Sequence, residues 1–254
     1  MDNQEVIDHL HQIVEISRDS ILKQKSINKE INDLYITAFY STIVDYAQSI
    51  VGSLKTDDLI GIPPAFRSLF EAHIDLLNLC KYEKYHKVLY SIHLWERINM
   101  LEATFKNPEN PYFKDTIENI DDRGNVINEY REELDSLKKE ISHFEGNLRQ
   151  IKTRFKLADL EEVYHGIYKV LCQDSHNDLL RLENRHFTKG EDGLIISMKT
   201  NWDFYDVSPH ILTTISILKM SLEKVFSEFQ YGDPKQYLDQ IDSHYQSLKN
   251  IFDK

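Results

Sequence analysis

The apolar segment from Pro63 to Cys80 constrains the fold more than any other part of the sequence. Its two opening prolines, Pro63 and Pro64, fit the first turn of a helix, where no backbone N–H donor is needed. Behind them nearly every helical face is apolar, which indicates a helix in the interior of the protein. We therefore expect the other helices to pack around residues 63–80.

One polar line interrupts this segment. Its members recur at spacings of four, four and three and so share one helical edge: Arg67, Glu71, Asp75 and Asn78. A buried charge without a partner is costly, so this edge faces either solvent or a partner group from elsewhere in the chain. The sequence leaves both alternatives open.

The composition predicts an all-α protein. A chain of 254 residues with only 8 Gly and 6 Pro has too few turn-forming residues for a β-sandwich or barrel. We expect a single helical domain over residues 1–254, built as a bundle of about eight helices. The formal net charge of −12 disfavours a broad phosphate-binding surface, although it does not exclude a local basic pocket.

The same sequence favours a cytoplasmic protein with no membrane contact. Residues 1–5 are acidic rather than basic, and no apolar run reaches membrane-spanning length. The two cysteines, Cys80 and Cys172, lie in apolar contexts without metal-type spacing. We interpret them as reduced core residues.

The strongest periodic signal is an apolar seam with alternating spacings of three and four: Ile127, Tyr130, Leu134, Leu137, Ile141, Phe144, Leu148, Ile151 and Phe155. It predicts one long helix over residues 127–155, in which Gly146 costs only about 1 kcal/mol. Packing against an antiparallel neighbour is favoured. A stalk or coiled coil that binds a protein partner or a second copy is the alternative.

The C-terminal half contains three further local patterns. A helix is expected over residues 157–182, with one face formed by Leu160, Val163, Tyr164, Ile167, Leu171 and Ser175. Residues 188–207 break the helical pattern and predict a short irregular or β arm. Ser208 and Pro209 then suit the N-cap and first position of a helix that continues to residue 229.

Glycine-rich phosphate loops, paired Cys-x-x-Cys units, His-Glu-x-x-His and nucleophile elbows are absent, so the sequence predicts no cofactor.

Three groups of residues give weaker functional signals than those motifs would. The first is the polar edge. Arg67 and Glu71 can form an ion pair, or Glu71 and Asp75 can offer two carboxylates to a cation.

The second group is centred on His176. It lies late in a predicted helix, where the negative end of the helix dipole favours the protonated imidazolium. The nearby carboxylates of Asp174 and Asp178 favour the same protonated form. A protonated His176 that faces Glu71 would be structural. A neutral one would suit general acid–base chemistry.

The third group is the Arg-x4-His pair of Arg181 and His186. It suits metal-independent RNA cleavage, in which histidine handles the proton of the 2′-hydroxyl and arginine stabilises the phosphorane. Acidic neighbours, among them Asp178 and Glu183, oppose phosphate binding there.

Two short elements carry a resemblance to a known family. Residues 67–72 read R-S-L-F-E-A, and residues 171–176 read L-C-Q-D-S-H. They resemble a bacterial family of helical proteins of unknown function that has R-S-L-x-E-A and L-S-x-x-S-H elements. Cys172 stands where that family has serine. The resemblance implies that Arg67, Glu71 and His176 meet across two helices.

The general plan is also similar to the HEPN group of helical proteins, which includes toxin and phage-defence ribonucleases with an Arg-x4-6-His motif. Arg181 and His186 match that motif, although Leu182 replaces the polar residue often found after the arginine. The resemblance implies an RNA substrate, with His176 or His186 as acid or base and Arg67 or Arg181 as the cation that faces phosphate.

Three functional hypotheses follow. The first is a bacterial defence or stress-response protein of HEPN-like type that cleaves RNA, as in phage defence or toxin–antitoxin systems. The second is a non-catalytic scaffold that binds a partner through the seam of residues 127–155. The third is a metal site formed by Glu71, Asp75 and His176.

Overall fold

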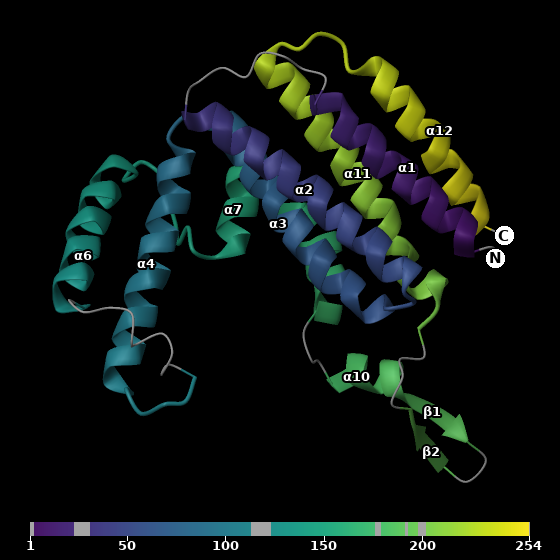
Figure 1. Ribbon diagram of the computed structural model, residues 1–254, viewed down its shortest axis with the longest axis horizontal. Helices are drawn as coiled ribbons and strands as arrows, with labels where there is room; N and C mark the ends of the chain where they lie inside the picture. The colour runs from purple at the N-terminus through teal and green to yellow at the C-terminus, as the bar shows by residue number, and fades with distance from the viewer. Residues whose placement is uncertain are drawn as a thin grey trace. The chain divides into compact units, whose positions relative to one another are not determined.

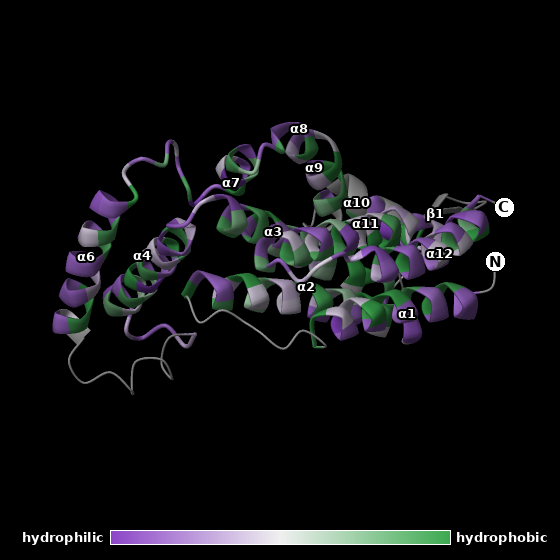
Figure 2. Ribbon diagram, turned by 90° about the horizontal axis from the view of Figure 1, so that it is seen from above, coloured by the Kyte–Doolittle hydropathy of each residue, from purple (hydrophilic) through white to green (hydrophobic). Residues whose placement is uncertain are grey.

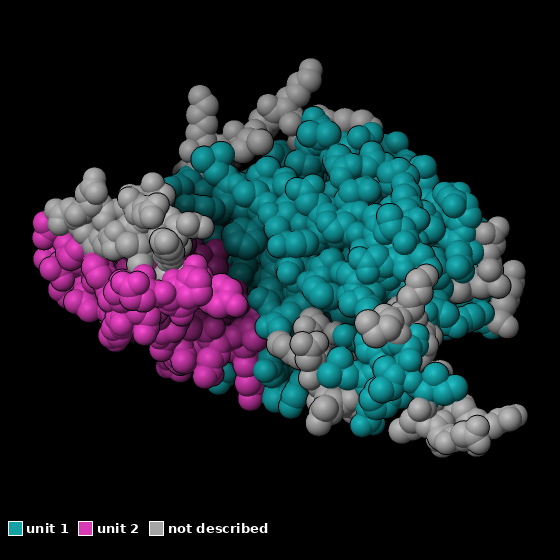
Figure 3. All heavy atoms as spheres, turned by 60° about the horizontal axis from the view of Figure 1, so that its bottom comes forward, with its two compact units in different colours: residues 1–81, 155–254 teal, residues 82–154 magenta. Residues whose placement is uncertain are grey.

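The computed structural model describes residues 3–22, 31–112, 123–175, 179–190, 193–197 and 202–253. These residues are predominantly helical (Figure 1), which confirms the all-α prediction. They form two compact units, residues 1–81 with 155–254 (unit 1) and residues 82–154 (unit 2), which Figure 3 colours separately. Two compact units can belong to one domain, so the single-domain prediction stays a prediction.

Five long helices make up most of unit 1: α1 (Asn3–Leu22), α2 (Ile31–Lys55), α3 (Ile62–Lys81), α11 (Phe204–Phe229) and α12 (Lys235–Phe252). As expected, α3 is central, because it packs against both α2 and α11. The first and last helices, α1 and α12, lie side by side (Figure 1). Hydrophobic and hydrophilic residues alternate along α1 and α2 (Figure 2), as amphipathic helices require.

The predicted polar edge of α3 runs from the surface into the core. Arg67 and Glu71 are partly exposed, whereas Asp75 and Asn78 are buried. His73, on a neighbouring face of α3, is buried as well. The edge therefore reaches solvent at one end and lies inside the protein at the other.

Several short elements lie between the long helices of the chain. They are η1 (Leu59–Gly61), which precedes α3, and then α7 (Ile151–Leu157), α8 (Glu161–Val163), the π-helical turn η2 (Tyr164–Tyr168), α9 (Lys169–Leu171), the 3₁₀ turn η3 (Cys172–Ser175) and α10 (Leu179–His186). A two-stranded antiparallel hairpin follows, with β1 (Phe187–Gly190) paired to β2 (Gly193–Ile196). This hairpin is the predicted arm.

The predicted start of α11 at Ser208 and Pro209 is wrong, because the helix begins at Phe204. Asp203 is its N-cap and forms a capping box with Asp206. Pro209 lies inside the helix and cannot donate to the carbonyl of Tyr205, four residues back. The Ser208 hydroxyl donates to that carbonyl instead, at 2.8 Å, which explains why the helix tolerates the proline.

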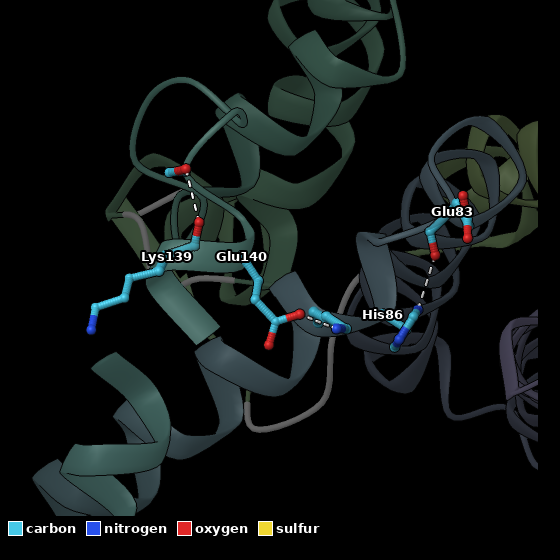
Figure 4. Close-up of polar contacts among 6 residues, drawn as sticks. Glu83, His86, Lys139 and Glu140 are labelled. Atoms are coloured by element: carbon cyan, nitrogen blue, oxygen red, sulfur yellow. Dashed lines mark hydrogen bonds and ion pairs between the residues drawn. The ribbon is translucent and has the colours of Figure 1, made fainter. Parts of the chain in front are cut away.

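Unit 2 is built on two packed helices, α4 (Tyr85–Lys106) and α6 (Arg123–Glu140). Leu94, Ile98 and Leu101 of α4 form a buried cluster with the seam residues of α6. Arg131 of α6 pairs with Glu102 of α4 at 2.6 Å. Glu140, which Figure 4 shows beside Lys139 at the end of α6, pairs with Lys87 of α4.

The prediction of one continuous helix over residues 127–155 is wrong. Helix α6 ends at Glu140, and α7 begins at Ile151 after an irregular segment. Gly146 lies in this segment with φ of +88°, a left-handed conformation that glycine adopts readily. The seam is nonetheless covered by the chain itself, because Ile127, Leu137 and Phe144 are buried. Binding of a protein partner through residues 127–155 stays a prediction.

Candidate functional site

The polar edge of α3 forms an ion pair at its exposed end. Arg67 Nε donates to Glu71 Oε1 at 2.8 Å, as the four-residue spacing predicts. The hydrogen bond to Glu71 raises the pKa of Arg67 above its ordinary value. The guanidinium is therefore permanently charged and held in a fixed orientation by its own helix.

Tyr168 completes this pair from a distant part of the chain. Its hydroxyl donates to the same oxygen, Glu71 Oε1, at 2.6 Å. Burial raises the pKa of Tyr168, and the negative charge of Glu71 raises it further, so the phenol stays protonated and remains a donor. One carboxylate oxygen thus joins α3 to η2.

Tyr168 was not among the predicted site residues, although it lies four residues after Tyr164 and three before Leu171 and so shares their face of a helix. The predicted helix over residues 157–182 is not regular, because residues 164–168 form a π-helical turn and residues 172–175 a 3₁₀ turn. Tyr168 is buried, whereas Ile167, predicted on the same face as Tyr164, is 47% exposed.

An aromatic cluster holds this turn against α3. Tyr168 packs against Phe70 of α3 and Phe155 of α7, with ring centroids 5.7 Å and 4.8 Å apart. The ring of Phe155 also contacts that of Tyr164, the first residue of the turn, with centroids 5.5 Å apart. Edge-on and tilted ring contacts at these distances are stabilising. The π-turn is therefore fixed by packing as well as by its bond to Glu71.

The second sequence element, residues 171–175, lies directly against α3 because η3 packs on that helix. His210 of α11 anchors its start, with Nε2 3.1 Å from the carbonyl oxygen of Leu171. A carbonyl can only accept, so Nε2 carries the proton. Phe66 of α3 contacts the imidazole of His210 edge-on at 5.2 Å. The two elements that carry the family resemblance are thus neighbours in space.

His176 falls outside the described residues, so its predicted meeting with Arg67 and Glu71 stays a prediction. The same holds for the metal set of Glu71, Asp75 and His176. Within the described ranges, no group of three or more His, Cys, Asp or Glu side chains could hold a metal ion. Glu71 Oε1 is already shared by Arg67 and Tyr168.

His186 lies where α10 meets the hairpin. Its Nδ1 is 3.0 Å from the carbonyl oxygen of Ser197, and its own carbonyl accepts from Ser197 N–H at 2.7 Å. A carbonyl oxygen can only accept, so Nδ1 carries the proton. In the neutral ring, Nε2 is then the basic nitrogen. The residue that follows β2 therefore sets both the orientation and the tautomer of His186.

The second predicted residue of this pair, Arg181, lies on α10, and its side chain is outside what the structure describes. Arg185 lies next to His186 and is buried, with its guanidinium 4.8 Å from the centroid of the Trp202 ring. This cation–π contact ties the end of α10 to the segment that leads into α11.

Comparison with known proteins adds one finding. Residues 33–194, more than half of the chain, match the model of a family of unknown function, DUF5677, which confirms the predicted resemblance to such a family. No curated protein and no solved structure matches the chain. None of the helices in the described ranges combines the length and hydropathy needed to cross a membrane.

Proposed function

This chain belongs to the DUF5677 family, and we propose that it is a HEPN-like effector that cleaves RNA without a metal ion, in the cytoplasm, during a bacterial defence or stress response. The observation that carries the proposal is the geometry of His186. A neutral imidazole whose Nδ1–H is held by the Ser197 carbonyl presents its basic Nε2 in a fixed direction.

The proposed reaction is an internal transesterification of RNA. Nε2 of His186 takes the proton of a 2′-hydroxyl, whose oxygen attacks the adjacent phosphorus. The P–O5′ bond breaks, the 5′-oxygen takes up a proton from solvent, and the imidazolium releases its proton to solvent. The products are a 2′,3′-cyclic phosphate and a 5′-hydroxyl end. The guanidinium of Arg181 stabilises the charge on the phosphorane.

Arg67 and Glu71 act as positioning residues in this proposal. Through Tyr168, Glu71 holds the π-turn on α3, and the chain reaches α10 shortly afterwards. The ion pair thus supports the segment that leads to His186 without itself touching substrate. His176 lies on the same segment and remains the alternative acid or base.

The proposal is tested by incubating the purified full chain with end-labelled single-stranded RNA in the presence of EDTA. Cleavage is expected, with 2′,3′-cyclic phosphate ends identified by mass spectrometry. Replacing a general base typically costs about 10²–10⁴-fold in rate, so His186→Ala is expected to lose activity on that scale. His93→Ala, which removes an exposed histidine of α4, is the matched control and is expected to cleave normally.

Two results would contradict the proposal. One is RNA that stays intact with the wild-type chain in every sequence context of a randomised pool. The other is cleavage by His186→Ala at the wild-type rate. If His186→Ala is active and His176→Ala is not, the base has been assigned to the wrong histidine.

A further inference from the structure

Unit 2 contains a cavity of about 410 Å³ between α4, α6 and the irregular segment that follows α6. This volume is within the range of small-molecule sites, roughly 300–1,000 Å³. All its lining residues belong to unit 2, so the cavity is defined within that unit alone. The residues proposed to cleave RNA belong to unit 1, and none of them lines this cavity.

Two cations line the cavity, and the described lining contains no carboxylate, although the chain has a formal net charge of −12. One cation is Arg149, whose guanidinium lies 4.0 Å from the centroid of the Trp95 ring. Its Nε also donates to Asn147 Oδ1 at 3.3 Å. These contacts orient the guanidinium, and no ion pair to it is present among the described residues.

The second cation is Lys138 of α6. Its Nζ lies 2.9 Å from Asp135, and both side chains of this pair are more than half exposed. Exposed pairs of this kind contribute little to stability, so a phosphate can replace Asp135 as the partner of Lys138 at small cost.

The rest of the cavity lining suits a flat ring. Ile92 and Leu134 supply apolar side chains from α4 and α6, and Leu148 supplies one from the segment after α6. The indole of Trp95 and the planar guanidinium of Arg149 offer surfaces on which an aromatic ring stacks. The cavity thus combines an apolar lining, a stacking surface and two cations.

We infer that this cavity binds a mononucleotide, with the base against the apolar side chains and Trp95 and the phosphate between Arg149 and Lys138. Arginine binds phosphate in a bidentate manner, and lysine adds a mobile positive charge. The base accounts for the aromatic and apolar lining, and the phosphate accounts for the cations. This ligand site does not depend on the proposed RNA cleavage.

The inference is tested by calorimetric titration of the full chain with adenosine 5′-monophosphate, and in parallel with adenosine and with inorganic phosphate. Saturable one-to-one binding of the nucleotide is expected, at least about tenfold tighter than either part alone. Arg149→Ala and Lys138→Ala are each expected to weaken nucleotide binding by at least about tenfold.

Two matched variants control for the loss of charge. Lys139→Ala removes the cation adjacent to Lys138 on α6, and Arg97→Ala removes an exposed arginine of α4; neither residue lines the cavity. Both are expected to bind the nucleotide like the wild type. Lys138 is exposed, so Lys138→Ala keeps the test valid even if Arg149→Ala disturbs the irregular segment.

A second readout uses tryptophan emission, since the chain has only two tryptophans. In a Trp202→Phe background Trp95 is the sole tryptophan, and the nucleotide is expected to quench its emission with the affinity measured by calorimetry. The inference is overturned by any of three results: no saturable binding of the nucleotide, equal binding by Lys138→Ala and Lys139→Ala, or adenosine bound as tightly as its monophosphate.

Discussion

Lowering the pH is expected to destabilise the protein through His73. This residue of α3 is 1% exposed, and its Nδ1 lies 2.7 Å from the Ser221 hydroxyl of α11. Burial lowers the pKa of His73 from 6.5 to about 4, because the charged ring would lose its hydration. The folded protein therefore keeps the ring neutral at pH values where the unfolded chain protonates it.

The direction of the effect follows from proton binding. Between about pH 6.5 and pH 4 the unfolded state binds the extra proton, so the free energy of unfolding falls as the pH falls and is fully retained above that window. At about 1.4 kcal/mol per pKa unit, the shift of His73 corresponds to about 3 kcal/mol in total. Of this, about 2 kcal/mol is lost between about pH 7.5 and pH 5.

The assay compares urea unfolding at these two pH values in the wild type and in His73→Gln, which cannot titrate. On acidification, the free energy of unfolding of the wild type is expected to fall by about 2 kcal/mol more than that of the variant, whatever their absolute stabilities. His165→Gln removes an exposed histidine of unit 1 and is expected to behave like the wild type. Equal pH dependence in the wild type and His73→Gln would refute the reasoning, as would an NMR titration of the His73 ring near its ordinary pKa.

Two further substitutions test contacts described above. Tyr168→Phe removes the donor to Glu71 and is expected to lower the free energy of unfolding by about 1 kcal/mol, measured by urea titration; an unchanged value would mean that this bond adds nothing. Gly146→Ala is expected to destabilise by about 1 kcal/mol, because φ is +88° and the new Cβ would lie 3.2 Å from Thr153 Cγ2. If the segment were helical, the same substitution would stabilise by a similar amount.

The long helices were predictable because their apolar side chains recur with the helical period. The end of α6 at Glu140 was not predictable, because the apolar residues that follow it keep the heptad spacing although they are not helical. Ile141 is still buried. The ring of Phe144 contacts those of Tyr82 and Tyr85, with ring centroids 5.3 Å and 6.2 Å apart. Spacing alone does not distinguish a helix from a turn that fills the same core.

At the candidate site, local contacts were predictable and distant ones were not. The pair of Arg67 and Glu71 follows from their spacing on one helix. The bond from Tyr168 spans 97 positions, and spacing within one helix does not identify a partner that far along the chain. The start of α11 did have a signal, since Asp203 and Asp206 have the spacing of a capping box, but Ser208 and Pro209 resemble a stronger one.

The polar groups of α3 explain how a central helix can specify the arrangement of its neighbours. Apolar packing tolerates small sliding movements, whereas a buried hydrogen bond has one partner and one geometry. Glu71 accepts from Tyr168 of η2, and His73 bonds Ser221 of α11. Each of these contacts fixes a different element against α3. Residues 171–175 are held at their N-terminal end, by Tyr168 just before them and by His210 at Leu171. Substitutions at Glu71 would therefore alter the RNA cleavage proposed for His186 only through position, so they should change its rate and leave its 2′,3′-cyclic phosphate products the same.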